Sequence, residues 1–205
     1  MIGIINYGSG NVRAIGNIYD QSNVPYRILN TYQDLDKTIT KLILPGVGAF
    51  DQTMSTLLKS GFKSALDDLV IGAKLPVLGI CVGMQILSEG SDEGDLPGLG
   101  WIKGHVRKFD AELLIQKPKL PHLGWNSVEI KKNSRLLESI DLVSGFYFIH
   151  SYYFECEDQK DRLTTTFYGK EFTSSVNKEN IFGTQFHPEK SHRNGIQLLI
   201  NFANL

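Results

Sequence analysis

PVLGICVGMQ, residues 76–85, combines a short apolar run with a cysteine that has a glycine on either side. Glycine leaves nothing to pack in a buried strand and costs backbone entropy, so Gly79 and Gly83 argue against an ordinary core segment. G-x-C-x-G has the spacing of a nucleophile elbow, in which a strand turns sharply into a helix and exposes the nucleophile. The alternative is an inert thiol, because free cysteine is among the most buried residue types. Whether Cys81 is a nucleophile depends on what the rest of the chain supplies.

Apolar runs alternate with amphipathic segments before this stretch. Strands are predicted at 2–6, 24–29, 41–46 and 76–80, and helices at 11–21, 49–59 and 62–71. Continuous apolar strands separated by helices indicate a parallel sheet covered on both faces. In such sheets the ligand site lies outside the carboxyl ends of the strands, where both PGVG (45–48) and the elbow fall.

The second half of the chain is richer in strands. These are predicted at 101–109, 125–130, 145–155, 164–168, 172–176 and 180–187, and a closing helix at 192–203. No internal repeat, low-complexity tract or Pro/Ser-rich linker interrupts the chain. The pattern therefore predicts an α/β fold with a mixed, mostly parallel sheet flanked by helices, in a single domain over residues 1–205.

Charge and cysteine content exclude several classes of function. The 21 Lys and Arg nearly balance 22 Asp and Glu, so we expect no binding to nucleic acid or an anionic membrane. The beginning of the chain lacks a signal-peptide pattern, and no apolar stretch is long enough for a membrane helix. The two cysteines show no CxxC or Cys/His ligand spacing, so no metal site is expected. A soluble, cytoplasmic protein with two free thiols is predicted.

A nucleophilic thiol has to be present as the thiolate, which a helix N-terminus or an imidazole stabilises. MQILSE after Gly83 predicts such a helix. Of the five histidines, His187 is the best partner, because TQFHPEK places it at the end of an apolar strand with Glu189 two residues later. A carboxylate on one ring nitrogen leaves the other free to take the thiol proton. Taken alone, this tripeptide is more typical of a strand cap on the surface.

An acyl-transfer site also needs hydrogen-bond donors for an oxyanion. In an elbow one donor is the N–H of the residue after the nucleophile, Val82, and PGVGAF offers a second through Val47 or Gly48. The alternative for PGVG is a tight turn before a helix. Neither GSGN nor GVGAF matches a dinucleotide or P-loop pattern, so nucleotide binding is not expected.

Together these motifs resemble those of the class I (triad) glutamine amidotransferases, in the same order along the chain. The segments PGVGAF, GICVGMQ, LPHLGWNSV, FYFIHSYYF and GTQFHPEKS are similar to those of the glutaminase subunits of imidazole glycerol phosphate synthase. The resemblance spans nearly the whole chain and implies a flavodoxin-like fold. It implies hydrolysis of L-glutamine to glutamate and ammonia through a γ-glutamyl thioester, with no metal or organic cofactor. It also implies a separate (β/α)8-barrel cyclase, which forms a heterodimer with the glutaminase and makes imidazole glycerol phosphate and an aminoimidazole carboxamide ribotide.

The resemblance assigns roles to particular residues. Cys81 corresponds to the nucleophile, His187 to the general base and acid, Glu189 to the residue that orients His187, and Val47 and Val82 to the oxyanion donors. Residues that correspond to contacts with glutamine are Gly48, Gln85, Glu93, His150, Ser151 and Tyr152. Asn11, Trp125 and Lys190 are candidates for the partner interface, since an aromatic ring and a long cation beside the catalytic strand suit an interface. Ordinary packing or solvation is the alternative for Trp125 and Lys190.

Two departures leave the acceptor of the ammonia open. Asn6 and Ser9 stand where the histidine-pathway subunits usually show an aspartate and a larger residue, and NVRAIGNIY (11–19) is similar to variants that serve sugar amidation in surface-polysaccharide synthesis. Three further readings are open: a hydrolase of γ-glutamyl groups, a small cysteine peptidase and a non-catalytic interaction module. The short chain leaves little room for a peptide cleft, and a binding module would not need Cys81, His187 and Glu189 together.

Overall fold

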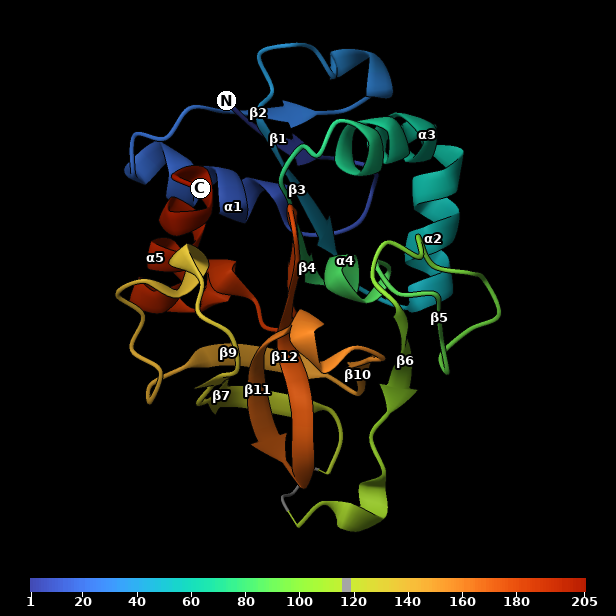
Figure 1. Cartoon of the computed structure of the whole chain (residues 1–205), viewed down its shortest axis with the longest axis vertical. Coiled ribbons are helices and arrows are strands. Elements are labelled where there is room, and N and C mark those ends of the chain that lie inside the picture. Colours follow the sequence, from blue (N-terminus) through green and yellow to red (C-terminus); the bar gives the residue numbers. More distant parts are fainter. Residues whose placement is uncertain (116–118) are drawn as a thin grey trace.

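The secondary structure is given by a computed structural model, which describes residues 1–115 and 119–205 (Figure 1). Its strands are β1 (Ile2–Ile5), β2 (Tyr26–Leu29), β3 (Lys41–Gly46), β4 (Val77–Cys81), β5 (Gly90–Ser91), β6 (Gly104–Lys108), β7 (His122–Asn126), β8 (Glu129–Ile130), β9 (Phe146–His150), β10 (Tyr152–Cys156), β11 (Arg162–Tyr168), β12 (Lys170–Lys178) and β13 (Ile181–Thr184). The α-helices are α1 (Val12–Gln21), α2 (Phe50–Lys59), α3 (Phe62–Leu66), α4 (Val82–Gln85) and α5 (His192–Ala203), and a π-helical segment (Asp67–Gly72) continues α3.

The apolar runs of the first half form the parallel part of a mixed sheet. Its order is β2-β1-β3-β4-β13-β12-β10-β6-β5, and the first five of these strands are mutually parallel. Helices α1 and α5 lie on one side of this part, and α2 and α3 lie on the other (Figure 1). Because both faces are covered, β1 and β4 are buried at every position, as their continuous apolar sequences predict.

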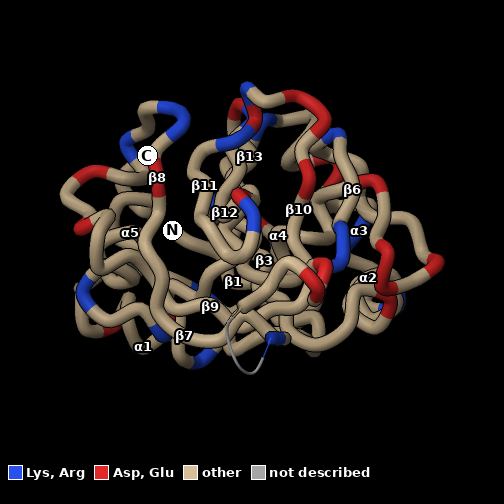
Figure 2. Tube along the Cα trace, turned by 90° about the horizontal axis from the view of Figure 1, so that it is seen from below, with Lys and Arg blue, Asp and Glu red and all other residues tan. Residues whose placement is uncertain are grey.

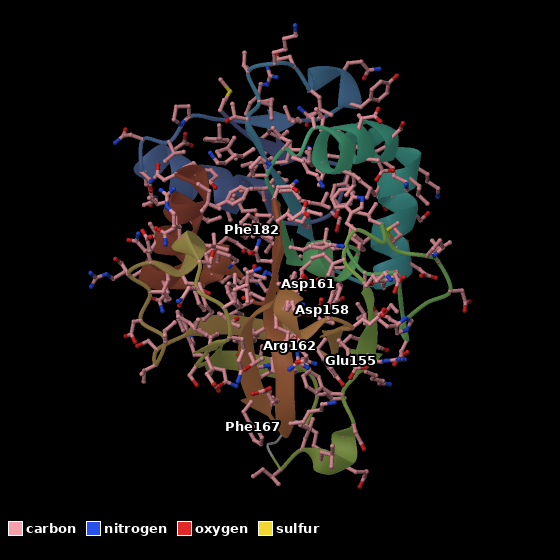
Figure 3. All side chains as sticks on the ribbon, in the orientation of Figure 1. Glu155, Asp158, Asp161, Arg162, Phe167 and Phe182 are labelled. Atoms are coloured by element: carbon pink, nitrogen blue, oxygen red, sulfur yellow. The ribbon has the colours of Figure 1, made fainter. Side chains whose placement is uncertain are left out.

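The strands of the second half complete the sheet in antiparallel fashion. β12 pairs with β13, β10 with β12 and β6 with β10, while β11 and β12 form a hairpin. Phe167 lies at the tip of this hairpin and is exposed, whereas Phe182 lies at the start of β13 in the body of the molecule (Figure 3). β7 and β9 form a separate antiparallel ribbon.

Two predicted strands, 125–130 and 145–155, each divide between sheets. Asn126 ends β7, and the chain then enters β8, which pairs with β11. In the second segment β9 pairs with β7, and after Ser151 the chain continues as β10 in the main sheet. Each segment reads as one strand in the sequence, and only the choice of partner strand separates its two halves.

The helix predicted after Gly83 is shorter than expected. α4 ends at Gln85, because the next carbonyl groups pair with a later loop instead of continuing the helix. Leu99 N–H donates to Ile86 O at 2.7 Å, and Ile102 N–H donates to Leu87 O at 3.1 Å. A backbone carbonyl bound in this way is satisfied without the next helical turn.

The parallel strands bring three predicted motifs to one edge of the sheet. Gly46 at the end of β3 lies opposite Cys81 at the end of β4, and Thr184 at the end of β13 lies opposite Ile80. The loops that begin at Val47 and Gln185 therefore flank the cysteine. Charged residues of both signs are distributed around the trace (Figure 2). Among the described residues, no helix combines the length and apolar character that crossing a membrane requires.

Candidate active site

The backbone at Cys81 makes the sharp turn of a nucleophile elbow. Cys81 has φ 55° and ψ −115°, and α4 begins at the next residue. A positive φ is uncommon for a residue with a Cβ, and strained backbone of this kind clusters at functional sites. The turn places the thiol at the start of α4, although the side chain is only 4% exposed. The elbow predicted from G-x-C-x-G is thus present in the fold.

Close packing explains the two glycines around the cysteine. A Cβ on Gly83 would lie 1.9 Å from the carbonyl oxygen of Leu44 in β3, and a Cβ on Gly79 would lie 2.5 Å from Gly83 O. Real Cβ atoms do not approach backbone this closely. The elbow therefore requires glycine at both positions in order to press α4 against β3 and β4.

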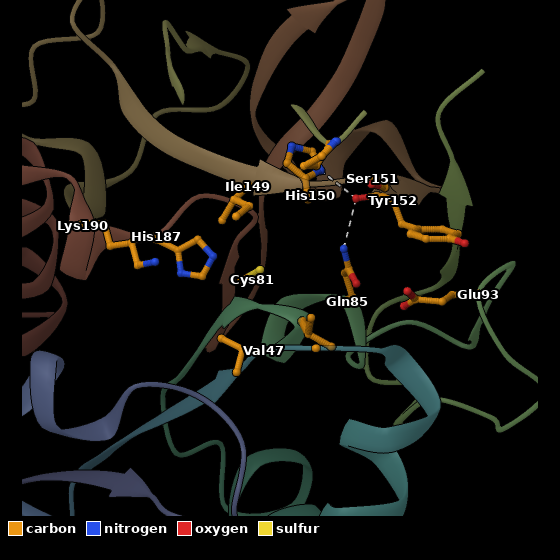
Figure 4. A pocket seen from close by; sticks show the side chains of 13 residues that line it. Val47, Cys81, Gln85, Glu93, Ile149, His150, Ser151, Tyr152, His187 and Lys190 are labelled. Carbon is orange, nitrogen blue, oxygen red and sulfur yellow. Dashed lines mark hydrogen bonds between the residues drawn. The ribbon is translucent and has the colours of Figure 1, made fainter. Parts of the chain in front are cut away.

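His187 and Glu189 form a buried pair beside the thiol. Their segment follows β13, the direct neighbour of β4, and His187 Nδ1 lies 2.8 Å from Glu189 Oε1. A carboxylate only accepts hydrogen bonds, so Nδ1 carries a proton and Nε2 is left for Cys81 (Figure 4). The two side chains are 4% and 3% exposed. β13 ends at Thr184, three residues earlier than predicted, and His187 instead precedes a 3₁₀ turn at Pro188–Lys190.

The surroundings of His187 favour its charged form. Burial alone lowers the pKa of His187, but hydrogen bonding with Cys81 and with Glu189 outweighs burial and raises this pKa to about 10. The thiolate is the reactive form of a cysteine nucleophile, and an imidazolium beside the sulfur stabilises that form. The imidazolium also holds the proton that a leaving amine needs.

The loop after β3 is held by side chains from the loop after β1. Ser9 Oγ donates to Val47 O at 3.0 Å and accepts from Val47 N–H at 2.9 Å, and Tyr7 OH donates to Pro45 O at 2.5 Å. The N–H of Val47, predicted as an oxyanion donor, is therefore bonded to Ser9 in this structure. Val82 is the first residue of α4, so its N–H has no acceptor within the helix.

A cavity of about 440 Å³ opens in front of Cys81. Nearly all the residues predicted to take part in chemistry or substrate binding line it: Val47, Gly48, Cys81, Val82, Gln85, Glu93, His150, Ser151, Tyr152 and His187, together with Lys190. Glu189 lies behind His187, and Glu93 accepts a hydrogen bond from Phe50 N–H at 2.8 Å at the start of α2. These residues, which come from five separate stretches of the chain, thus meet in one cavity.

Buried polar residues that were not predicted surround the cavity. Gln185 is fully buried, contacts Cys81 Sγ and accepts a hydrogen bond from Gln85 Nε2 at 3.0 Å. His122 Nδ1 lies 3.0 Å from His150 Nε2. Burial lowers the pKa of His122 to about 4, and burial with the nearby His122 lowers that of His150 to about 3. The signal for Gln185 was a polar residue in the apolar run before His187, and the signal for His122 was LPHLGWN itself.

The three candidate interface residues lie in different surroundings. Trp125 is 47% exposed on β7 and stacks on His192, with ring centroids 5.4 Å apart. Lys190 lies at the cavity, with Nζ 5.8 Å from the centroid of the Tyr147 ring. Asn11 caps α1 by accepting from Ala14 N–H at 3.2 Å, and it does not line the cavity. No group of three or more His, Cys, Asp or Glu side chains within 1–115 and 119–205 is arranged to hold a metal ion.

The elbow, the His–Glu pair and the cavity define a cysteine amidotransferase site, and the comparisons with known proteins agree. The family model described as glutamine amidotransferase class-I matches residues 4–204, so the chain belongs to the class I glutamine amidotransferase family. The chain is 50% identical to the imidazole glycerol phosphate synthase subunit HisH of Leptospira borgpetersenii over 205 residues, which covers 100% of both chains. It is 48% identical to subunit HisH 2 of Methanococcus maripaludis, over 98% of each chain.

Solved structures share the fold at lower identity. A crystal structure described as a glutamine amidotransferase has a TM-score of 0.72 at 15% identity and covers 100% of this chain, which covers 99% of that one. The structure of PurLQS from Thermotoga maritima has a TM-score of 0.74 at 15% identity, with coverage of 99% and 97%. The predicted flavodoxin-like amidotransferase fold is thereby confirmed.

Proposed function

We propose that this protein is the glutaminase subunit of an imidazole glycerol phosphate synthase, which hydrolyses L-glutamine to glutamate and ammonia for histidine biosynthesis. The observation that carries the proposal is Cys81 at a nucleophile elbow, beside the buried His187–Glu189 pair and at the wall of a cavity of about 440 Å³. This volume is at the small end of the range for small-molecule sites, about 300–1,000 Å³, and suits a single amino acid. Full-length relatives named HisH support the pathway.

The proposed reaction proceeds through a thioester. The Cys81 thiolate attacks the side-chain amide carbon of glutamine, and the imidazolium of His187 gives its proton to the departing ammonia. His187 then takes a proton from water, which attacks the thioester and releases glutamate and the thiolate. Glu189 keeps His187 in the tautomer that both steps need. One glutamine and one water become one glutamate and one ammonia.

The oxyanion formed in each step needs two donors. Val82 N–H, at the start of α4, suits the first. For Val47 N–H to serve as the second, its peptide has to turn away from Ser9 Oγ, which now accepts it at 2.9 Å. The loop is exposed at Val47, so this peptide would rotate in solvent and not against core side chains. We infer that the glutaminase gains activity when this loop rearranges.

The cavity walls support an assignment of the two ends of glutamine. Glu93 would supply a carboxylate for the α-amino group, and the segment from His150 to Tyr152 would bind the α-carboxylate. Gly48 and Gln85 also line the cavity and would contact the rest of the glutamine molecule. These contacts stay proposals that a glutamine-bound structure can test.

The outer face of the β7–β9 ribbon is the proposed docking surface for the partner. Leu123, Trp125 and Ile149 are exposed to 53%, 47% and 39%, and Leu123 lies opposite Ile149 in the ribbon. Ile149 also lines the cavity, so this apolar face continues into the mouth of the active site. Contiguous exposed apolar surface marks an interaction site, and Lys190 supplies a polar rim. A synthase subunit seated there would receive ammonia before water protonates it.

The test of the proposal is coupled turnover. Glutamate release is measured for the chain alone, with a barrel cyclase of the histidine pathway and its acceptor, and with a sugar amidotransferase and its acceptor. Stimulation by the cyclase alone is expected. Stimulation by the sugar enzyme alone would reassign the acceptor, and full activity without any partner would contradict a coupled subunit and favour an independent hydrolase.

Two variants locate the interface. W125A should lower the stimulation by the cyclase without changing the activity of the chain alone, because Trp125 lies outside the cavity. I71A is the matched control: Ile71 is similarly exposed, at 42%, but lies in the π-helical segment before the opposite end of β4. Equal effects of both variants would remove the ribbon as the docking surface. We also place the protein in the cytoplasm, since its two cysteines are unpaired as in a reducing compartment.

A further inference from the structure

Gln185 contacts the nucleophile from behind. Its side chain is fully buried, its Nε2 lies 3.8 Å from Cys81 Sγ, and its backbone N–H donates to Ser174 O at 2.9 Å. It does not line the cavity, so it reaches the sulfur from within the protein interior. A methionine or leucine would pack equally well at this position. Packing alone therefore does not explain a buried amide that is aimed at the reacting atom.

The hydrogen bonds around Gln185 determine which of its two amide atoms faces the sulfur. Gln85 Nε2 lies 3.1 Å from the carbonyl oxygen of Tyr152 (Figure 4). It also lies 3.0 Å from Gln185 Oε1. A backbone carbonyl can only accept, so Gln85 presents its NH₂ group to Tyr152. The same NH₂ group then requires an oxygen on Gln185. The NH₂ group of Gln185 is left to face Cys81.

The carbonyl that sets this direction is itself held in place. His150 Nδ1 lies 2.7 Å from Tyr152 O and donates to it. Reversing the amide of Gln185 would require reversing Gln85 as well, which would put an amide oxygen against the carbonyl oxygen of Tyr152. Two acceptor oxygens that face each other in a buried site are costly, so the hydrogen bonds from Tyr152 to Cys81 have one favourable direction.

We propose that Gln185 is a further catalytic residue, whose NH₂ group donates a hydrogen bond to Cys81 Sγ and stabilises the thiolate. The amide carries no titratable proton, so the donor is present at every pH at which the protein is folded. It acts when the thiolate attacks glutamine and again when the thiolate leaves the thioester. The rate effect rests on the proposed glutaminase function, whereas the effect on the thiol does not.

The experiment measures the thiolate directly, without glutamine or a partner. The rate of alkylation of Cys81 by iodoacetamide is followed against pH for the native protein and for Q185M and Q185E, with the labelled peptide identified by mass spectrometry. Q185M keeps the length of the side chain and removes the donor. Q185E keeps the shape and places an acceptor beside the sulfur. Other titratable groups near the sulfur or around the cavity are unchanged in these variants: Tyr7, Glu93, His150, Tyr152, His187 and Lys190.

In Q185M the pH of half-maximal alkylation should rise by about one unit, which is about tenfold less thiolate on the acid side. In Q185E the rise should be at least as large. Glutaminase kcat should fall by about tenfold on the acid side with KM nearly constant, because Gln185 does not line the cavity. Q197M is the matched control, since Gln197 bonds Asn201 on α5, and it should leave the alkylation profile unchanged.

An unchanged alkylation profile in either folded variant would overturn the proposal, and thermal unfolding establishes that each variant is folded. A shifted profile in a protein that does not hydrolyse glutamine would support the hydrogen bond and refute the proposed function. Glutamine hydrolysis with an unshifted alkylation profile would support the proposed function and refute the hydrogen bond from Gln185. The two proposals therefore fail separately.

Discussion

Lowering the pH from 7 to 5 should destabilise this protein through two buried histidines. His122 and His150 are 3% and 6% exposed and lie 3.0 Å apart through Nδ1 and Nε2. Burial lowers the pKa of His122 to about 4, and burial with the nearby His122 lowers that of His150 to about 3. Both rings stay neutral in the folded protein at pH 5, whereas in the unfolded chain both bind protons below the ordinary value of about 6.5.

The sign and size of the effect follow from linkage. A lowered folded pKa gives a stabilisation that is complete above pH 6.5 and is lost as the pH falls toward the folded pKa. At 1.36 kcal/mol per unit, each ring costs about 2 kcal/mol at pH 5. His187 opposes this, because its raised pKa gives a stabilisation that is full below pH 6.5 and is lost as the pH rises toward 10. Between pH 7 and pH 5, His187 adds less than about 1 kcal/mol to the free energy of unfolding. The net decrease in the free energy of unfolding is therefore about 3 kcal/mol.

The assay is urea unfolding at pH 7 and pH 5 at constant ionic strength, followed by far-UV circular dichroism. H122F should halve the part of the pH-dependent change in unfolding free energy that comes from His122 and His150. The ring of His122 stacks between Phe148 and Tyr168, and a phenylalanine would occupy the same space without titrating. A difference below about 1 kcal/mol between the two pH values in the native protein would refute the reasoning. Full pH dependence in H122F would refute the role of His122.

Three further predictions concern the elbow and the triad. C81S should abolish glutamine hydrolysis without unfolding the protein. An electrophilic glutamine analogue should label Cys81 and spare Cys156, because burial raises the pKa of the Cys156 thiol to about 12. Mass spectrometry that finds the label on Cys156 alone would contradict this prediction. E189Q should lower kcat by about 10²–10⁴-fold with little change in KM, because the amide cannot stabilise an imidazolium at His187. This loss should be smaller than the loss in C81S. Unchanged steady-state kinetics would place the third triad member elsewhere. G83A should lower the free energy of unfolding by at least about 1–3 kcal/mol, since its Cβ would lie 1.9 Å from Leu44 O; a melting temperature equal to that of the native protein would show that the elbow can relax.

Much of the secondary structure was predictable because its signals are local. The apolar runs of β1, β3 and β4 and the periodic pattern of α2 appear at the predicted ranges. The segment predicted as a helix at 62–71 ends its α-helical part at Leu66 and continues as a π-helix. The predictions that differ more involve the choice of partner strand, as in 125–130 and 145–155, and that choice depends on residues far along the chain.

Some residues of the candidate site could also be named from the sequence, whereas the contacts of others depend on the tertiary structure. The triad candidates follow from local motifs such as G-x-C-x-G and H-P-E, whereas the expected contacts with glutamine follow only from the family resemblance. Gln185 and Ser9 could not be given their contacts in advance. Gln185 reaches Cys81 because β13 lies beside β4, and Ser9 engages Val47 because β1 lies beside β3.

The sequence by itself determined the α/β pattern, the elbow with its required glycines, and the set of groups available for amide hydrolysis. These depend on backbone geometry and side-chain chemistry within a few residues of one another. Only the tertiary structure decided that Val47 N–H is bonded to Ser9, that the Gln185 amide faces the sulfur, and that His122 and His150 are neutral. Such properties are set by strand order and by the removal of water around buried groups. Both arise when segments distant in the chain pack together.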